Sequence, residues 1–202
     1  MNTSGWRNAV VNYIRDAARP VDKFGHQPRL YALAVELGKG MDYDDDVVFA
    51  AAWMHDLGVF IGHRPENPEA LARWDHIPYT IDRTRALLPA WGFPAEKLDA
   101  VADVIRTHQP NGHPESVEGM LVHDADILEQ LGAMGAMRAL AKVGRDSRYQ
   151  NFSSVLQVLH SAVHDLPPKL CLSHSMHLAE PRVASLQAFV VAIEQEAGDF
   201  LH

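Results

Sequence analysis

The sequence predicts an all-α protein, a single helical bundle of about seven or eight helices. Two observations predict this class. Apolar residues recur at spacings of three and four along most of the chain, which is the period of a helix with one buried face. Alternation of apolar and polar residues, the pattern of a half-buried strand, hardly occurs. No repeat or long polar linker divides the chain, so we expect one domain over residues 1–202.

Acidic residues, glycines and prolines mark the expected helices of the first half. Residues 26–38 carry an apolar stripe that ends at a glycine. The segment 42–58, "DYDDDVVFAAAWMHDLG", begins with carboxylates, which favour a helix N-terminus, and also ends at a glycine. A loop then leads into a short helix within 65–74. The next helix, over 77–88, ends near Pro89.

The second half continues the same helical pattern. Pro94 lies near a helix start, and Pro181 is expected in the first turn of the last helix. The core of the domain is expected over about 20–135, with closing helices over about 152–200. The individual helical segments are 92–108, 115–132, 133–144, 153–166 and 177–198.

Composition excludes several classes of function. The formal charge is −8 and the basic residues are scattered, which argues against a nucleic-acid or membrane-surface partner. The single cysteine, Cys171, excludes an internal disulfide and a cysteine-rich zinc site. There is no apolar signal region and no run of 18 apolar residues, so we expect a cytoplasmic protein. Nothing in the sequence fixes an oligomeric state.

Common catalytic motifs are missing from the sequence. It has no Gly-rich phosphate loop, no GxSxG elbow and no HExxH pair. The stretch "DYDDD" imitates a calcium loop, but Val47 and Trp53 stand where that loop needs Gly and Glu. An acidic helix start explains it better. Cys171 is interpreted as a small hydrophobic residue rather than a nucleophile.

The unusual feature is an ordered series of histidines and aspartates on apolar helix faces. A single histidine in such a place is more often a hydrogen-bonded core residue than a ligand. Several inward-facing imidazoles and carboxylates, however, are explained by a shared divalent cation. A second His-Asp pair, His164-Asp165, precedes "LPPK" and is expected to end a helix without binding metal. The series consists of His26, His55, Asp56, His76, His108 and Asp126.

This series resembles the HD-domain superfamily of metal-dependent phosphohydrolases, whose pattern is H…HD…D on an all-α scaffold. The resembling segments are "HQPRLYALAVELG", "AAWMHDLG", "GFPAEKLDAVADVIRTHQP" and "MLVHDADILEQLGAMG". The match covers residues 20–135, and the tail resembles more loosely a bacterial branch similar to nucleotide pyrophosphohydrolases. The resemblance implies four core metal ligands: His26, His55, Asp56 and Asp126.

Two more histidines, His76 and His108, extend the pattern to H…HD…H…H…D. In some HD families these residues help to hold two metals bridged by the HD aspartate. The lysine that often follows HD-x-G in the cyclic-dinucleotide phosphodiesterase branch is replaced here by Val59. The resemblance implies one or two transition metals per chain, and nitrogen and oxygen ligands accept Mn, Fe, Co, Ni or Zn.

The implied function is hydrolysis of a small phosphorylated substrate, a nucleotide or another phosphate ester, by metal-activated water. Asp56 would hold the metal and steer the water, with Glu66 as an acid or base. The candidates for contact with substrate phosphate are Arg29, His63 and Arg64. Two alternatives stay open: an HD-type di-iron oxygenase, which shares the six-residue pattern, and a non-catalytic module that binds a nucleotide or metal.

Overall fold

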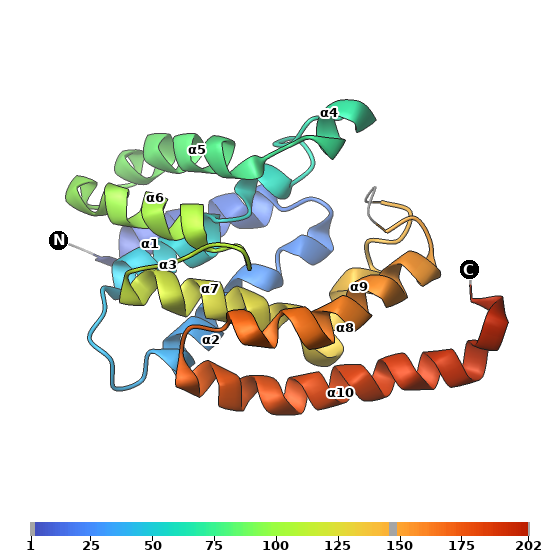
Figure 1. Cartoon of the computed structure of the whole chain (residues 1–202). Coiled ribbons are helices and arrows are strands. Elements are labelled where there is room, and N and C mark those ends of the chain that lie inside the picture. The colour runs from blue at the N-terminus through green and yellow to red at the C-terminus, as the bar shows by residue number, and fades with distance from the viewer. Residues whose placement is uncertain (1–2, 146–148, 202) are drawn as a thin grey trace. The chain divides into compact units, whose positions relative to one another are not determined.

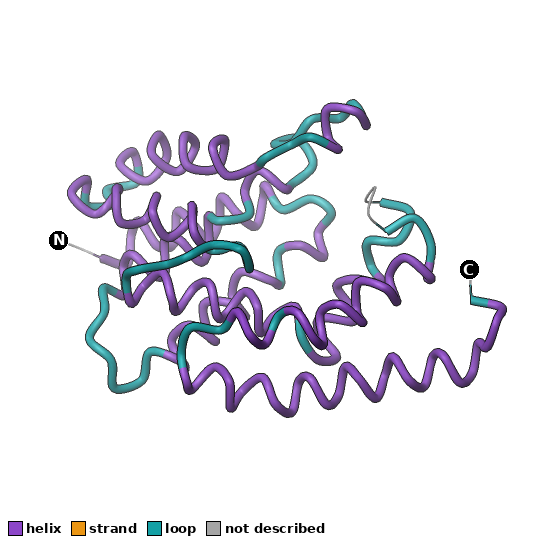
Figure 2. The backbone as a smooth tube through the Cα atoms, in the orientation of Figure 1, coloured by secondary structure: helices purple, strands orange, loops and turns teal. Residues whose placement is uncertain are grey.

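In the computed structural model, residues 3–145 and 149–201 are described, and they form ten α-helices and no strand. Figure 1 shows the helices in chain order, and Figure 2 shows helices joined only by loops and turns. The all-α prediction is confirmed, although there are more helices than expected. The helix missing from the prediction is α1, Thr3–Ala17. The sequence does contain the apolar spacing of this helix, since Trp6, Val10 and Ile14 are four residues apart. All three side chains are buried in the structure.

The chain divides into two compact units, residues 1–125 and 126–202. The division falls inside α7, Val117–Gln130, so this helix contributes to both.

In the first unit, α3 (Asp45–Met54) is the central helix, and every residue from Val47 to Met54 is buried. It contacts α1, α2 (His26–Leu37) and α6 (Leu98–Thr107). A helix with apolar side chains all around is stable only when its neighbours cover every face. The end of α3 therefore places whatever follows Met54 inside the unit.

Two more helices of the first unit lie between α3 and α6 in the chain. They are α4 (Pro68–Ala72), capped by Asn67, and α5 (His76–Ala90), capped by Asp75. Helix α5 contacts α6 and the 3-10 turn Leu57–Val59, which directly follows the His-Asp pair.

The acidic stretch before α3 is the helix start that the sequence predicts. The Asp44 carboxylate accepts hydrogen bonds from the backbone N–H groups of Asp46 and Val47. Two basic side chains complete it: Arg7 Nη2 lies 2.6 Å from Asp46 Oδ1, and Lys97 Nζ lies 2.7 Å from Asp44 Oδ2. These partners offset the charges of Asp44 and Asp46.

The second unit contains the end of α7 followed by α8 (Gly132–Leu140), α9 (Phe152–Asp165) and α10 (Ser173–Ala197). Helix α10 packs on α8 and α9, and α8 offers it small buried residues. The expected place of Pro181 is wrong, because α10 begins at Ser173 and Pro181 lies inside the helix. Pro181 is exposed, so the hydrogen bond that its missing N–H forfeits is on the solvent side.

Among the described residues, no helix combines the length and hydropathy needed to cross a membrane.

Candidate metal centre

The His-Asp pair lies where the buried helix α3 ends. His55 is the C-cap residue, and its side chain is 0% exposed. Asp56 leaves the helical conformation with φ −100° and ψ 11° and keeps 20% of its side chain exposed. The pair is thus placed between the core of the first unit and solvent, which allows a small ligand to reach the carboxylate.

The orientation of His55 is fixed by its own helix. Its Nδ1 lies 3.0 Å from the carbonyl oxygen of Ala52, and a carbonyl only accepts, so Nδ1 carries the proton. In a neutral imidazole the other nitrogen, Nε2, then presents a lone pair. His108 repeats this arrangement, since its Nδ1 donates to the Ile105 carbonyl at 2.7 Å. Such backbone bonds are typical of metal-ligating histidines, whose second nitrogen is left for the metal.

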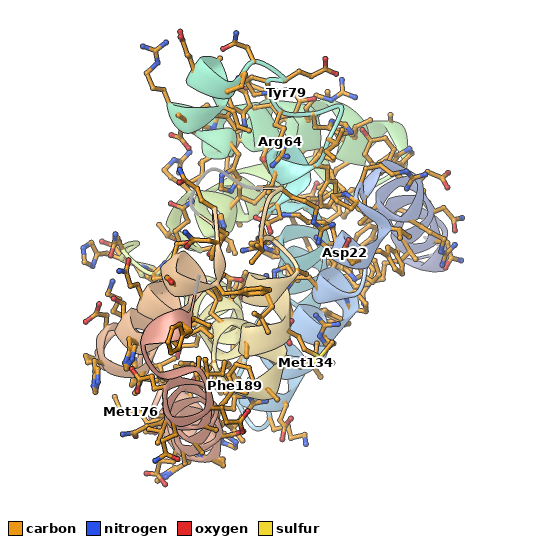
Figure 3. The ribbon with its side chains drawn as sticks, turned by 90° about the vertical axis from the view of Figure 1, so that its right-hand side faces the viewer. Asp22, Arg64, Tyr79, Met134, Met176 and Phe189 are labelled. Atoms are coloured by element: carbon orange, nitrogen blue, oxygen red, sulfur yellow. The ribbon has the colours of Figure 1, made fainter. Side chains whose placement is uncertain are left out.

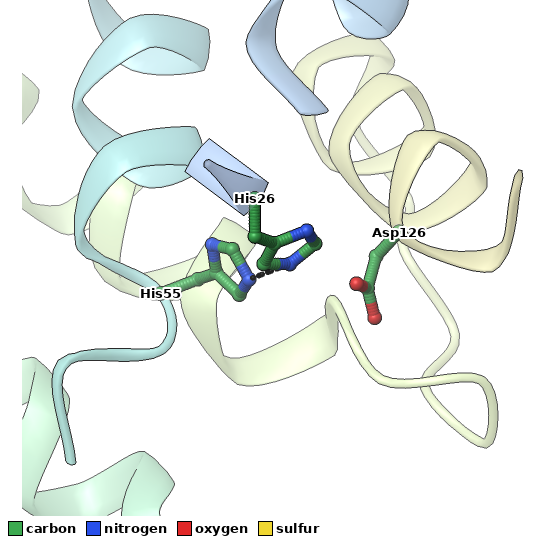
Figure 4. Close-up of side chains that lie close together, drawn as sticks. All are labelled: His26, His55 and Asp126. Carbon is green, nitrogen blue, oxygen red and sulfur yellow. Dashed lines mark hydrogen bonds between the residues drawn. The ribbon is translucent and has the colours of Figure 1, made fainter. Parts of the chain in front are cut away.

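His26 points its Nε2 at the Nε2 of His55, 3.3 Å away, as Figure 4 shows. It is the first residue of α2 and is buried. When a metal–nitrogen bond is about 2.0–2.1 Å, two nitrogens on one metal are separated by about 2.9 Å in octahedral and about 3.4 Å in tetrahedral coordination. The observed separation falls within that interval. The two imidazoles therefore fit a shared cation.

The Asp56 carboxylate faces different histidines with its two oxygens. Oδ2 lies 3.7 Å from His55 Nε2 and 3.9 Å from His26 Nε2, whereas Oδ1 lies 3.6 Å from His76 Nε2. Burial alone would raise the pKa of Asp56, but His55, His26 and His76, together with Lys23, hold that pKa well below its usual range. An ionised carboxylate with histidines at both oxygens is suited to bridge two cations.

His76 and His108 belong to the same cluster. The ring of His108 lies 4.8 Å from that of His55 and 5.7 Å from that of His76, measured between centroids. Ligand atoms of His55, Asp56 and His108 lie within 4.8 Å of one another. The first unit alone therefore brings together five of the six residues that the sequence predicts as metal ligands.

A close contact at Gly58 holds α5, and with it His76, against the turn after Asp56. A Cβ added to Gly58 would lie 2.9 Å from the Cβ of His76 and 3.0 Å from its carbonyl oxygen. The backbone N–H of Gly58 donates to Thr80 Oγ1 at 3.1 Å, and its carbonyl accepts from Trp74 Nε1 at 2.9 Å. Trp74 and Thr80 could not be predicted from the sequence, because their role depends on how α5 docks against the turn that contains Gly58.

The sixth predicted ligand, Asp126, lies on α7 as the first residue of the second unit. Its side chain is buried, and its Oδ2 accepts a hydrogen bond from Gln130 Nε2 at 3.1 Å. Its assignment as a metal ligand stays a prediction.

The other predicted site residues lie around the metal ligands in sequence. Arg29 is half-buried on α2, one turn after His26, with its guanidinium against Gly25. His63 and Arg64 are half-buried in the turn that follows the His-Asp pair, and His63 Nδ1 lies 2.8 Å from the hydroxyl of Tyr79. Glu66 is exposed, and the structure does not bring it into the cluster. The roles of these four residues stay predictions.

The first unit thus gathers histidines around one aspartate on an all-α fold, a donor set suited to a divalent cation. The HD domain family matches residues 24–131, more than half of the chain. The chain therefore belongs to the HD domain family. No curated protein matches it significantly.

Solved structures with the same fold cover nearly the whole chain. Bacillus subtilis YpgQ in complex with ADP is 23% identical, with a TM-score of 0.73 and coverage of 99% of both chains. A predicted HD superfamily hydrolase from an uncultured Thermotogales bacterium is 24% identical, with a TM-score of 0.64 over 95% of this chain and 92% of that one. An HD-superfamily hydrolase from Bacillus thuringiensis is 19% identical, with a TM-score of 0.67 over 96% and 97%. The protein thus has the fold of HD-superfamily hydrolases.

Proposed function

We propose that this protein is a metal-dependent phosphohydrolase that acts on a nucleotide or another small phosphate ester. The observation that carries the proposal is the cluster in the first unit, in which three imidazole Nε2 atoms lie within 3.9 Å of one carboxylate. Binding of ADP by YpgQ, which shares the fold, supports a nucleotide substrate.

A divalent cation in this cluster would supply acidified water as the nucleophile and positive charge for the phosphoryl oxygens. The chain's own residues do the rest. His26 and His55 would hold one cation with Asp56, and Asp126 is the proposed additional ligand; His76 and His108 would hold a second. The backbone bonds of His55 and His108 keep each Nε2 aimed at the cluster.

The residues beyond the cluster would meet the substrate. Arg29, His63 and Arg64 offer hydrogen-bond donors suited to phosphate oxygens. Glu66, on the exposed loop, is the proposed acid or base and would have to approach when substrate binds.

A second function, a di-iron oxygenase, is compatible with one specific observation. His76 lies 3.6 Å from Asp56 Oδ1 and its ring neighbours that of His108, so both extra histidines of the six-residue pattern lie in the cluster. The oxygenase requires both as ligands, and so does a binuclear phosphodiesterase.

Metal content per chain, measured by plasma mass spectrometry on protein purified without chelators, tests both functions. We expect two metals in the wild type and about one in His76→Ala. Phosphate release from nucleotides by the manganese-loaded protein supports the hydrolase. Oxygen consumption by a predominantly iron-loaded protein that releases no phosphate supports the oxygenase. Metal binding with neither reaction would leave a non-catalytic binding module.

A further inference from the structure

Five aromatic rings form a continuous strip in the first unit. The ring centroids are 5.8 Å apart for Trp74 and Tyr79, 5.9 Å for Tyr79 and His63, 6.4 Å for His63 and Tyr13, and 5.2 Å for Tyr13 and Trp91. Tyr13 belongs to α1, His63 to the turn after the His-Asp pair and Tyr79 to the first turn of α5, while Trp74 and Trp91 flank α5 on either side. Tyr79 is labelled in Figure 3, as is Arg64 of the adjoining turn.

The strip is a surface feature rather than core. All five of its rings are half-buried. The aromatic core of the same unit consists of other residues, all buried: Trp6, Phe49, Trp53, Phe60 and Phe93. Half-exposed rings in contact with one another present flat apolar faces and edges to a ligand, and such faces stack well on nucleobases.

One end of the strip adjoins the metal cluster. His76, Tyr79, Thr80 and Arg83 share one face of α5, because they are spaced by three and four. The helical rise places Tyr79 about 4.5 Å along the axis from His76. Trp74, at the same end, donates to the carbonyl of Gly58, two residues after Asp56.

The strip also carries positive charge. Arg83 Nη2 donates to the Tyr13 hydroxyl at 3.4 Å, while its buried Nε has no hydrogen-bond partner among the described residues. The hydrogen bond between His63 and the Tyr79 hydroxyl fixes both rings relative to each other. Rings and guanidinium together suit a ligand that is both aromatic and anionic, which a nucleotide is.

We propose that the base of the nucleotide stacks on the Trp74–Tyr79 end of the strip while its phosphates lie at the metal cluster. Tyr79 is then a specificity-determining residue. The inference rests on the proposed function, since it takes the substrate to be a nucleotide bound through its phosphates.

The test compares two ligands that differ only in the nucleoside. The probes are α,β-methylene-ADP and methylenediphosphonate, neither of which is readily hydrolysed, titrated calorimetrically into manganese-loaded protein. We expect Tyr79→Ala to weaken α,β-methylene-ADP about tenfold and to change methylenediphosphonate less than twofold, since stacking is worth about a factor of ten per base. Tyr79→Phe is the matched comparison, because it keeps the ring and loses only the hydroxyl bonded to His63; it should weaken α,β-methylene-ADP much less than Tyr79→Ala does.

The outcomes separate the base site from the proposed function. Equal weakening of both probes by Tyr79→Ala, or no weakening of either, overturns the base site. A wild-type protein that binds neither probe overturns the proposed function itself. Metal content and circular dichroism of each variant show whether the fold and the cluster are retained.

Tryptophan fluorescence tests the proposal independently, in case Tyr79→Ala does not fold. Two of the four tryptophans, Trp6 and Trp53, are buried, while Trp74 and Trp91 are half-buried. Stacking predicts that α,β-methylene-ADP quenches the fluorescence of the wild type and that methylenediphosphonate does not. The quenching should vanish in Trp74→Phe and persist in Trp91→Phe, at the far end of the strip. Quenching that survives Trp74→Phe contradicts the proposal.

Discussion

The two ends of α3 both carry carboxylates, but their surroundings differ in kind. At the N-terminus, Arg7 and Lys97 pair with Asp44, Asp45 and Asp46, and backbone amides complete the cap. At the C-terminus, the Nε2 atoms of His26, His55 and His76 lie within 3.9 Å of the Asp56 carboxylate. The first end is satisfied by permanently charged side chains. The second offers nitrogen and oxygen atoms that could bind a cation. The N-terminal end of α3 is therefore stabilised by ion pairs, whereas a metal ion would complete the C-terminal end.

The substitution expected to have the strongest consequence is Asp56→Asn, at the C-terminal end of α3. Asp56→Asn should abolish metal binding, because it removes the negative charge that faces His26 and His55 with one oxygen and His76 with the other. Manganese at about 100 times its Kd should stabilise the wild type by about 2.7 kcal/mol, or about 5–10 °C in Tm for a chain of this size. Differential scanning fluorimetry with and without manganese should show this shift for the wild type and none for Asp56→Asn. Asp46→Asn, at the other end of α3, is the control and should keep the full shift.

A smaller effect is expected where α5 meets the turn after Asp56. Gly58→Ala places a methyl group 2.9 Å from His76 Cβ and 3.0 Å from the backbone oxygen of His76. The displacement of α5 should cost about 1–3 kcal/mol and lower the occupancy of the metal that His76 holds. Urea denaturation and metal analysis measure the two effects.

Gly5→Ala provides the matched control for Gly58→Ala. Gly5 lies in α1, and a Cβ there meets nothing within 4 Å. The substitution should stabilise the protein by about 0.5–1 kcal/mol without changing metal content. If Gly58→Ala behaves in the same way, the close approach of α5 does not position His76.

Much of this site could be predicted from sequence because helical spacing shows which residues face inward. His108 continues an apolar stripe and is buried, and His55 follows a run of apolar residues that the structure buries completely. Trp74 and Thr80 could not be predicted, since their hydrogen bonds to the backbone of Gly58 depend on where α5 packs against the turn after Asp56. Glu66 was chosen for its chemistry beside the His-Asp pair in sequence. In the structure Glu66 is exposed. Its position could not be predicted, because a polar loop has no periodicity that indicates where its side chains point.

The stability that Asp46 contributes at the N-terminal end of α3 should depend on pH. Burial would raise the pKa of Asp46, but hydrogen bonds from Arg7 and Lys97 hold it below its usual value. A carboxylate with a lower pKa in the folded state stabilises the fold fully above its unfolded pKa of about 3.9, and this stabilisation is lost as pH falls through the folded value. Asp46→Asn should therefore cost about 1–2 kcal/mol at pH 7, and the gap to the wild type should close as pH falls below about 3.9 and through the lower folded pKa of Asp46. Denaturant unfolding at several pH values measures it; a gap independent of pH would show that the carboxylate charge is not what stabilises this end.

The smallest effect is expected at the second His-Asp pair. His164 and Asp165 end α9 as the sequence predicts, and both side chains are exposed. A carboxylate at a helix C-terminus is slightly unfavourable, so Asp165→Asn should stabilise the protein by a few tenths of a kcal/mol. Metal content should equal that of the wild type. The dipeptide is the same as at 55–56, but α9 buries only one face, so both side chains project into solvent, and no imidazole of the described part of the chain pairs with the Asp165 carboxylate. If Asp165→Asn lowers metal content as Asp56→Asn does, the dipeptide itself, rather than the burial of the helix before it, would decide where metal binds.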